Sequence, residues 1–94
     1  MDTKILQVVA QTNVLEVASK KTEGGKLAKC YIRLRELGGQ YENEYLCAVF
    51  GNLAKCVFSE GDLVVASLRF QTHESNGQYY QDIVANDIVP INNK

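Results

Sequence analysis

The sequence predicts an all-β fold: one small closed barrel of five strands, with a short helix between the third and fourth strands. Two observations carry this prediction. Asn76-Gly77 separates two long runs rich in β-branched residues, and an Asn-Gly pair tolerates the positive φ angles of a tight hairpin connection. Residues 27–36 alternate between apolar and polar side chains, as in a strand with one buried face. The 94 residues suit one such domain.

The first third of the chain predicts two strands joined by a looser segment. Residues 3–11 are rich in Ile, Leu and Val and predict the first strand, and residues 14–17 add a short strand piece. Residues 20–26 (KKTEGGK) are polar and contain glycine, which indicates a turn. The second strand follows over residues 27–36.

The second strand presents a basic and aromatic face. Because side chains alternate along a strand, Cys30, Ile32 and Leu34 are expected to point into the core. Three cations and one ring, with no acidic residue among them, take the opposite parity: Lys29, Tyr31, Arg33 and Arg35. Such a face is either a solvated surface or a ligand surface.

The middle of the chain predicts a turn at residues 37–40 and a third strand at residues 41–50. The second half of this strand is apolar on both parities, so either both of its faces are covered or one holds a ligand. Residues 52–58 fit two turns of helix, with Asn52 at or near the N-cap.

The fourth and fifth strands are the arms of the long hairpin, residues 63–72 and 78–91. In the first arm, one parity is expected to pack against the core and the other is free to meet a ligand. The packing parity holds Leu68, Phe70 and Thr72, and the free parity holds Arg69, Gln71 and His73.

Composition excludes several classes of protein. The net charge of −1 argues against a strongly basic nucleic-acid binder, although a local basic stripe matters more than the total. No apolar run reaches the ~20 residues of a membrane span, and no leader opens the chain, so a cytoplasmic protein is expected.

Cys30, Cys47 and Cys56 lie in apolar surroundings and are expected to be buried structural thiols.

Several stretches resemble the bacterial single-stranded DNA-binding proteins, a family of the OB-fold type. They are KILQVV at residues 4–9, FGNLAK at residues 50–55, GDLVVASLRF at residues 61–70 and NGQYYQDIVANDIV at residues 76–89. Together they span nearly the whole chain, and their order and spacing carry the resemblance. It implies a five-stranded OB-fold barrel that binds single-stranded DNA without sequence preference, in DNA replication, repair or recombination.

The resemblance also implies a ligand face on which rings stack on bases and cations contact phosphates. Phe50 matches a stacking position, with closure of the core as its alternative role, and Arg69 matches a basic position. Tryptophan is absent, so weaker binding or a shorter footprint is expected. The full predicted nucleic-acid-binding set is Lys29, Tyr31, Arg33, Arg35, Phe50, Arg69, Gln71, His73 and Tyr80.

The end of the chain departs from the family pattern, because the usual partner-recruiting tail is not seen after the last strand. This feature resembles the tailless primosomal proteins of the PriB type. The alternative function is therefore an OB-fold protein–protein adaptor, primosomal or an accessory factor of a mobile element. A homodimer or homotetramer is expected, with replication or recombination proteins as further partners.

An enzyme is not expected. The sequence has a single histidine, no glycine loop that would cradle a phosphate before a helix, and no constellation of nucleophile and base. No metal site and no cofactor are predicted.

Overall fold

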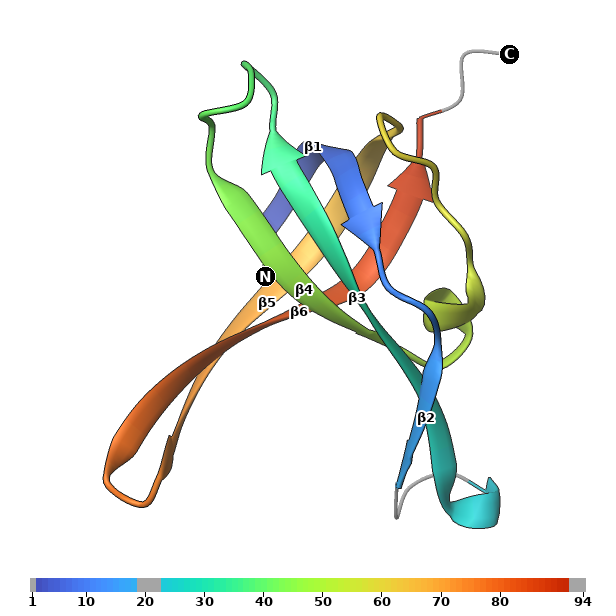
Figure 1. Ribbon diagram of the computed structural model, residues 1–94, viewed down its shortest axis with the longest axis vertical. Helices are drawn as coiled ribbons and strands as arrows, with labels where there is room; N and C mark the ends of the chain where they lie inside the picture. Colours follow the sequence, from blue (N-terminus) through green and yellow to red (C-terminus); the bar gives the residue numbers. More distant parts are fainter. Residues whose placement is uncertain (1, 19–22, 92–94) are drawn as a thin grey trace.

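The computed structural model describes residues 2–18 and 23–91, and over these residues the chain forms one mixed sheet of six strands (Figure 1). Two 3-10 turns, η1 (Glu23–Gly25) and η2 (Gly51–Lys55), interrupt the strands. The all-β prediction is confirmed. The strands are β1 (Asp2–Gln11), β2 (Leu15–Ala18), β3 (Lys26–Glu36), β4 (Glu44–Phe50), β5 (Leu63–Ser75) and β6 (Gln78–Pro90).

Strand β1 is shared between two neighbours. Residues 2–7 pair antiparallel with β5, and residues 6–11 pair antiparallel with β3 across a bulge. Strand β3 also pairs with β4, β5 pairs with β6, and β6 meets β4 in parallel at Ala48 and Val84. Strands β1, β4, β5 and β6 therefore have two strand neighbours each, β3 has three, and β2 pairs with β3 alone.

The core collects one parity of side chains from the longer strands. On β3 the predicted alternation is confirmed, because Cys30, Ile32 and Leu34 are buried while Tyr31 and Arg33 are exposed. The rest of the core comes chiefly from β1, β4, β5 and β6. Its largest fully buried side chains are Leu6, Val8, Cys47, Val49, Val64 and Leu68.

The Asn-Gly hairpin is also confirmed. Asn76 and Gly77 have φ angles of 54° and 80°, both in the left-handed region. Figure 1 shows the two arms projecting away from the other strands, and the side chains of residues 69–75 and 78–82 are exposed. Leu68 is buried as predicted, but Phe70 is 39% exposed. The prediction that Phe70 and Thr72 belong to the core is wrong: both are exposed on the projecting arm, although the Phe70 ring meets the Tyr45 ring edge-on with centroids 6.2 Å apart.

The predicted helix at residues 52–58 is wrong. The chain makes only the short turn η2, and Asn52 lies within this turn rather than capping a helix. The Gln11 side chain donates to the carbonyl of Cys56 (2.7 Å) and accepts from the N–H of Phe58 (2.9 Å), so these backbone groups bond to β1 instead of continuing a helix. No helix in the described residues has the length and apolar character needed to span a bilayer.

Several strand boundaries differ from prediction. The strand piece predicted at residues 14–17 is a separate sixth strand, β2, at Leu15–Ala18, and β5 extends to Ser75 rather than ending at residue 72. The third strand begins at Glu44 rather than Tyr41, because Glu36 N–H donates to Asn43 O (2.9 Å) and closes residues 37–43 into a loop. The turn predicted at residues 20–26 lies partly outside the described residues, and Lys26 already belongs to β3.

The three thiols divide by burial. Cys30 and Cys47 are buried, as predicted, but Cys56 is exposed at the end of η2, so its prediction as a buried thiol is wrong. Burial raises the pKa of the Cys47 thiol to about 12 and so suppresses its reactive thiolate.

We expect a thiol reagent such as Ellman's to modify Cys56 rapidly in the native protein and the other two only after unfolding. The folded Cys56→Ser variant should then show no rapid phase of thiol modification. Equally fast modification of all three thiols in the native protein would contradict this burial pattern.

Candidate functional site

The outer faces of β3 and β4 carry a lysine between two rings. Lys29 lies directly opposite Phe50 in the register, and Tyr31 lies opposite Ala48, so all four side chains share one face. Lys29 Nζ is 4.8 Å from the centroid of the Tyr31 ring and 5.4 Å from that of the Phe50 ring. Each ring is 37% exposed. Phe50 therefore lies outside the core, and core closure, its alternative role, is wrong.

This face forms one wall of a groove of about 490 Å³ whose other wall is the base of the β5–β6 hairpin. Residues far apart in the sequence meet here because β4 and β6 pair at Ala48 and Val84. From β3 and β4 the lining residues are Lys29, Tyr31, Leu46, Ala48 and Phe50. From β5 and β6 they are Arg69, Gln71, Gln81, Asp82, Ile83 and Val84.

Arg69 is held in place by its neighbour on the same face of β5. The Gln71 amide, oriented with its oxygen toward Arg69, accepts hydrogen bonds from Arg69 Nε and Nη2 at 3.1 Å each. Arg69 Nη1 has no hydrogen-bond partner within the described part of the chain. The guanidinium is thus oriented while keeping donors available for an anionic ligand.

The groove contains one opposing charge. Among its lining residues Lys29 and Arg69 are cationic, and Asp82 is anionic. Asp82 Oδ2 lies 3.1 Å from His73 Nδ1, and the His73 ring stacks on Tyr80 with centroids 5.4 Å apart. In the hairpin register His73 lies opposite Tyr80, nearer the turn than Gln71 and Asp82. Both rings therefore lie outside the groove, toward the tip of the hairpin.

Comparison with known proteins does not decide what this site binds. No protein-family model matches the sequence, and no curated protein and no solved structure shows significant similarity to the chain. The function must therefore be inferred from the residues of the site itself.

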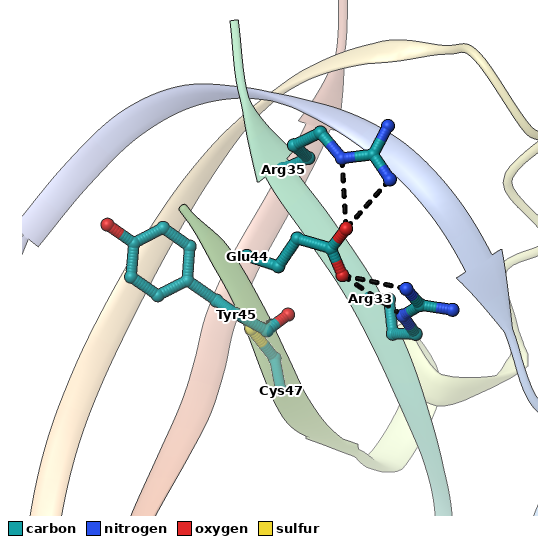
Figure 2. A network of polar contacts seen from close by, with 5 residues as sticks. All are labelled: Arg33, Arg35, Glu44, Tyr45 and Cys47. Carbon is teal, nitrogen blue, oxygen red and sulfur yellow. Dashed lines mark hydrogen bonds and ion pairs between the residues drawn. The ribbon is translucent and has the colours of Figure 1, made fainter. Parts of the chain in front are cut away.

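Arg33 and Arg35 are paired with a carboxylate (Figure 2). Arg33 donates to Glu44 Oε1 from Nε (3.3 Å) and Nη2 (2.7 Å), and Arg35 donates to Glu44 Oε2 from Nε (3.0 Å) and Nη2 (2.7 Å). Figure 2 shows Glu44 between the two guanidinium groups, with Tyr45 directed away from them. The hydrogen bonds from Arg33 and Arg35 hold the pKa of Glu44 below its usual value. The basic face of β3 is therefore not free of acidic charge.

The structure brings together five of the nine predicted site residues: Lys29, Tyr31, Phe50, Arg69 and Gln71. Arg33 and Arg35 lie beyond the groove along β3, and His73 and Tyr80 lie beyond it along the hairpin. Leu46 and Ala48 were missed as site residues, although the apolar outward parity of their strand indicated a covered or ligand-binding face. The β6 residues that line the groove carry no signal in the sequence, because only the β4–β6 pairing places them there.

Proposed function

We propose that this protein binds single-stranded DNA, without sequence preference, in the groove between β3–β4 and the β5–β6 hairpin. Tyr31 and Phe50 stack on bases, and Lys29 and Arg69 contact phosphates. One observation carries the proposal: a single groove holds two half-exposed rings and two cations from strands that are distant in sequence. Stacking on a ring is tolerant of sequence because every base has a π face.

We further propose that the sheet is an OB-fold barrel. The pairings support this, because they run in sequence from β1 through β5, β6, β4 and β3 and return to β1. OB-folds bind oligonucleotides across the faces of their central strands, and the groove lies on β3 and β4.

The number of unpaired cations sets the expected salt dependence. Each phosphate neutralised on a single strand contributes a slope of about −0.7 to the logarithm of affinity against the logarithm of salt. Lys29 and Arg69 alone give a slope of about −1.4, whereas all four basic residues, with Arg33 and Arg35, would give about −2.8. We expect the shallower slope for a labelled oligo-dT strand measured by fluorescence anisotropy.

Duplex DNA of the same length is the control for stacking. Its bases are not free to stack on Tyr31 and Phe50, so we expect much weaker binding than to the single strand. Equal affinity for both forms, or no binding to the single strand at low salt, would contradict the proposed function.

We also propose that the protein is a homodimer or homotetramer. Ile5 lies opposite Val65, and Val65 lies opposite Val89, so these side chains form an apolar row across β1, β5 and β6. Ile5 and Val89 are about half exposed, and apolar patches on a small domain often mark interfaces.

Light scattering is expected to give a multiple of the 10.5 kDa chain mass at micromolar concentration. A mass of one chain would refute the oligomer, and Val89→Lys should shift an oligomer toward the monomer.

The alternative is a protein–protein adaptor, favoured by a second and more apolar cleft of about 400 Å³. It lies between the end of β1 and the segment after η2, and its lining includes Val14, Val57 and Phe58. Val57 is 89% exposed and Val14 is 43% exposed, so this cleft carries apolar surface that a partner could cover. The adaptor function predicts no measurable binding of oligo-dT by the pure protein, which separates the two functions.

A further inference from the structure

The Arg33–Glu44–Arg35 cluster has the donor geometry of a phosphate site. Each guanidinium directs two N–H groups at one oxygen, and the two oxygens belong to the same carboxylate. Arginine forks bind carboxylate and phosphate in the same way. A phosphodiester also offers two non-bridging oxygens on one atom, so it could replace the Glu44 carboxylate oxygen for oxygen.

The position of this cluster follows from the strand register. Arg33 and Arg35 continue the face of β3 that begins with Lys29 and Tyr31, and residues on one face recur about every 6.6 Å. Arg33 lies opposite Leu46, which lines the groove. A strand that leaves the groove along β3 would therefore meet the two arginines next.

Glu44 is suited to occupy this site permanently. It lies opposite Arg35 on β4 and is fixed within 2.7 Å of both guanidinium groups. A glutamate is ionised at neutral pH, and the hydrogen bonds from Arg33 and Arg35 lower the pKa of Glu44 further. The side chains of Arg33 and Arg35 remain 49% and 23% exposed, so solvent and a ligand can reach the cluster.

We propose that Glu44 occupies a phosphodiester-binding site formed by Arg33 and Arg35, and so confines a bound single strand to the groove. This inference rests on the proposed function. Within the described residues, Lys29 and Arg69 are then the groups of the native protein that contact phosphates. Removing the Glu44 charge opens the arginine site and extends the bound strand along β3.

The test compares the salt dependence of oligo-dT binding in wild type and Glu44→Gln. Between about 50 and 200 mM salt, two phosphate contacts predict a loss of affinity of about 7-fold, and four predict about 50-fold. We expect the smaller loss in wild type and the larger loss in Glu44→Gln. Glu42→Gln removes the same charge from the neighbouring loop and should keep the wild-type loss.

A second comparison separates release of the arginines from a general gain in positive charge. Arg35→Ala should change wild-type affinity by less than about twofold, because Glu44 already occupies Arg35. In the Glu44→Gln background the same substitution should reduce the loss across the salt range to about 20-fold, as three contacts predict. Glu44→Thr, which also suits a strand, is a second variant if Glu44→Gln is poorly folded by circular dichroism.

Three outcomes decide the inference. An unchanged salt dependence in Glu44→Gln and Glu44→Thr would overturn it while leaving the proposed function intact, since wild type would still bind. The single variant Arg35→Ala, with Glu44 retained, provides the second outcome. If it lost as much affinity for oligo-dT as Lys29→Ala does, the inference would be overturned, because the DNA strand would then displace Glu44 without any substitution. Absence of oligo-dT binding by wild type and both Glu44 variants would overturn the inference and the proposed function together.

Discussion

Tyr31→Ala and Phe50→Ala are each expected to weaken oligo-dT binding by about 1–3 kcal/mol, roughly 5- to 150-fold. Each ring lines the groove and exposes 37% of its surface, so a base can stack on it. The combined variant should lose less than the sum of the two losses, because Lys29 contacts both rings and couples them. Fluorescence anisotropy at fixed low salt measures all three affinities.

Tyr41→Ala is the matched control for these variants. The Tyr41 side chain is 91% exposed and lies in the loop before β4, outside the groove, so its removal should leave binding unchanged. All of these proteins should melt within a few degrees of wild type, since neither Tyr31 nor Phe50 belongs to the buried core. Unfolding of the ring variants, or an equal loss of binding in Tyr41→Ala, would contradict the placement of the stacking face.

Ile32→Ala is expected to lower the free energy of unfolding by about 2–5 kcal/mol. Ile32 is 1% exposed and points from β3 into the core, one residue from Tyr31 on the opposite parity. Truncation there removes buried methyl groups and leaves a cavity that the surrounding strands fill only in part. Chemical denaturation monitored by circular dichroism measures the loss.

Ile91→Ala is the control for the same truncation at an exposed site. Ile91 is partly exposed just beyond β6, and its backbone N–H bond to Leu63 O does not depend on the side chain. Its cost should be well under that of Ile32→Ala. If Ile32→Ala left stability unchanged and weakened binding instead, the two faces of β3 would be assigned the wrong way round.

Local patterns predicted the parts of the fold that depend on neighbouring residues. Alternation over β3 identified which side chains enter the core, because the strand has one covered face. The conformational preference of Asn76-Gly77 located the hairpin turn. The same reasoning failed at residues 52–58, where bonds from the Gln11 side chain, distant in sequence, hold the backbone out of a helix.

The candidate site was predicted in part for a related reason. The parity of a strand shows which residues share a face, so Lys29 and Tyr31 could be grouped from the sequence. Parity alone does not show which residue of the neighbouring strand lies opposite a given residue. The pairing of Glu44 with Arg33 and Arg35 depends on the register across the loop at residues 37–43, and this pairing changes the expected number of phosphate contacts from four to two.

The central claim is that a single strand binds in the groove between β3–β4 and the base of the hairpin. Titration of the protein with oligo-dT while its backbone amide NMR signals are followed tests this claim most directly. We expect the largest shifts at Lys29, Tyr31, Phe50 and Arg69, with little change around Val57 in the second cleft. Shifts centred on Val57 and Phe58, or no shifts at saturating oligo-dT, would contradict the claim.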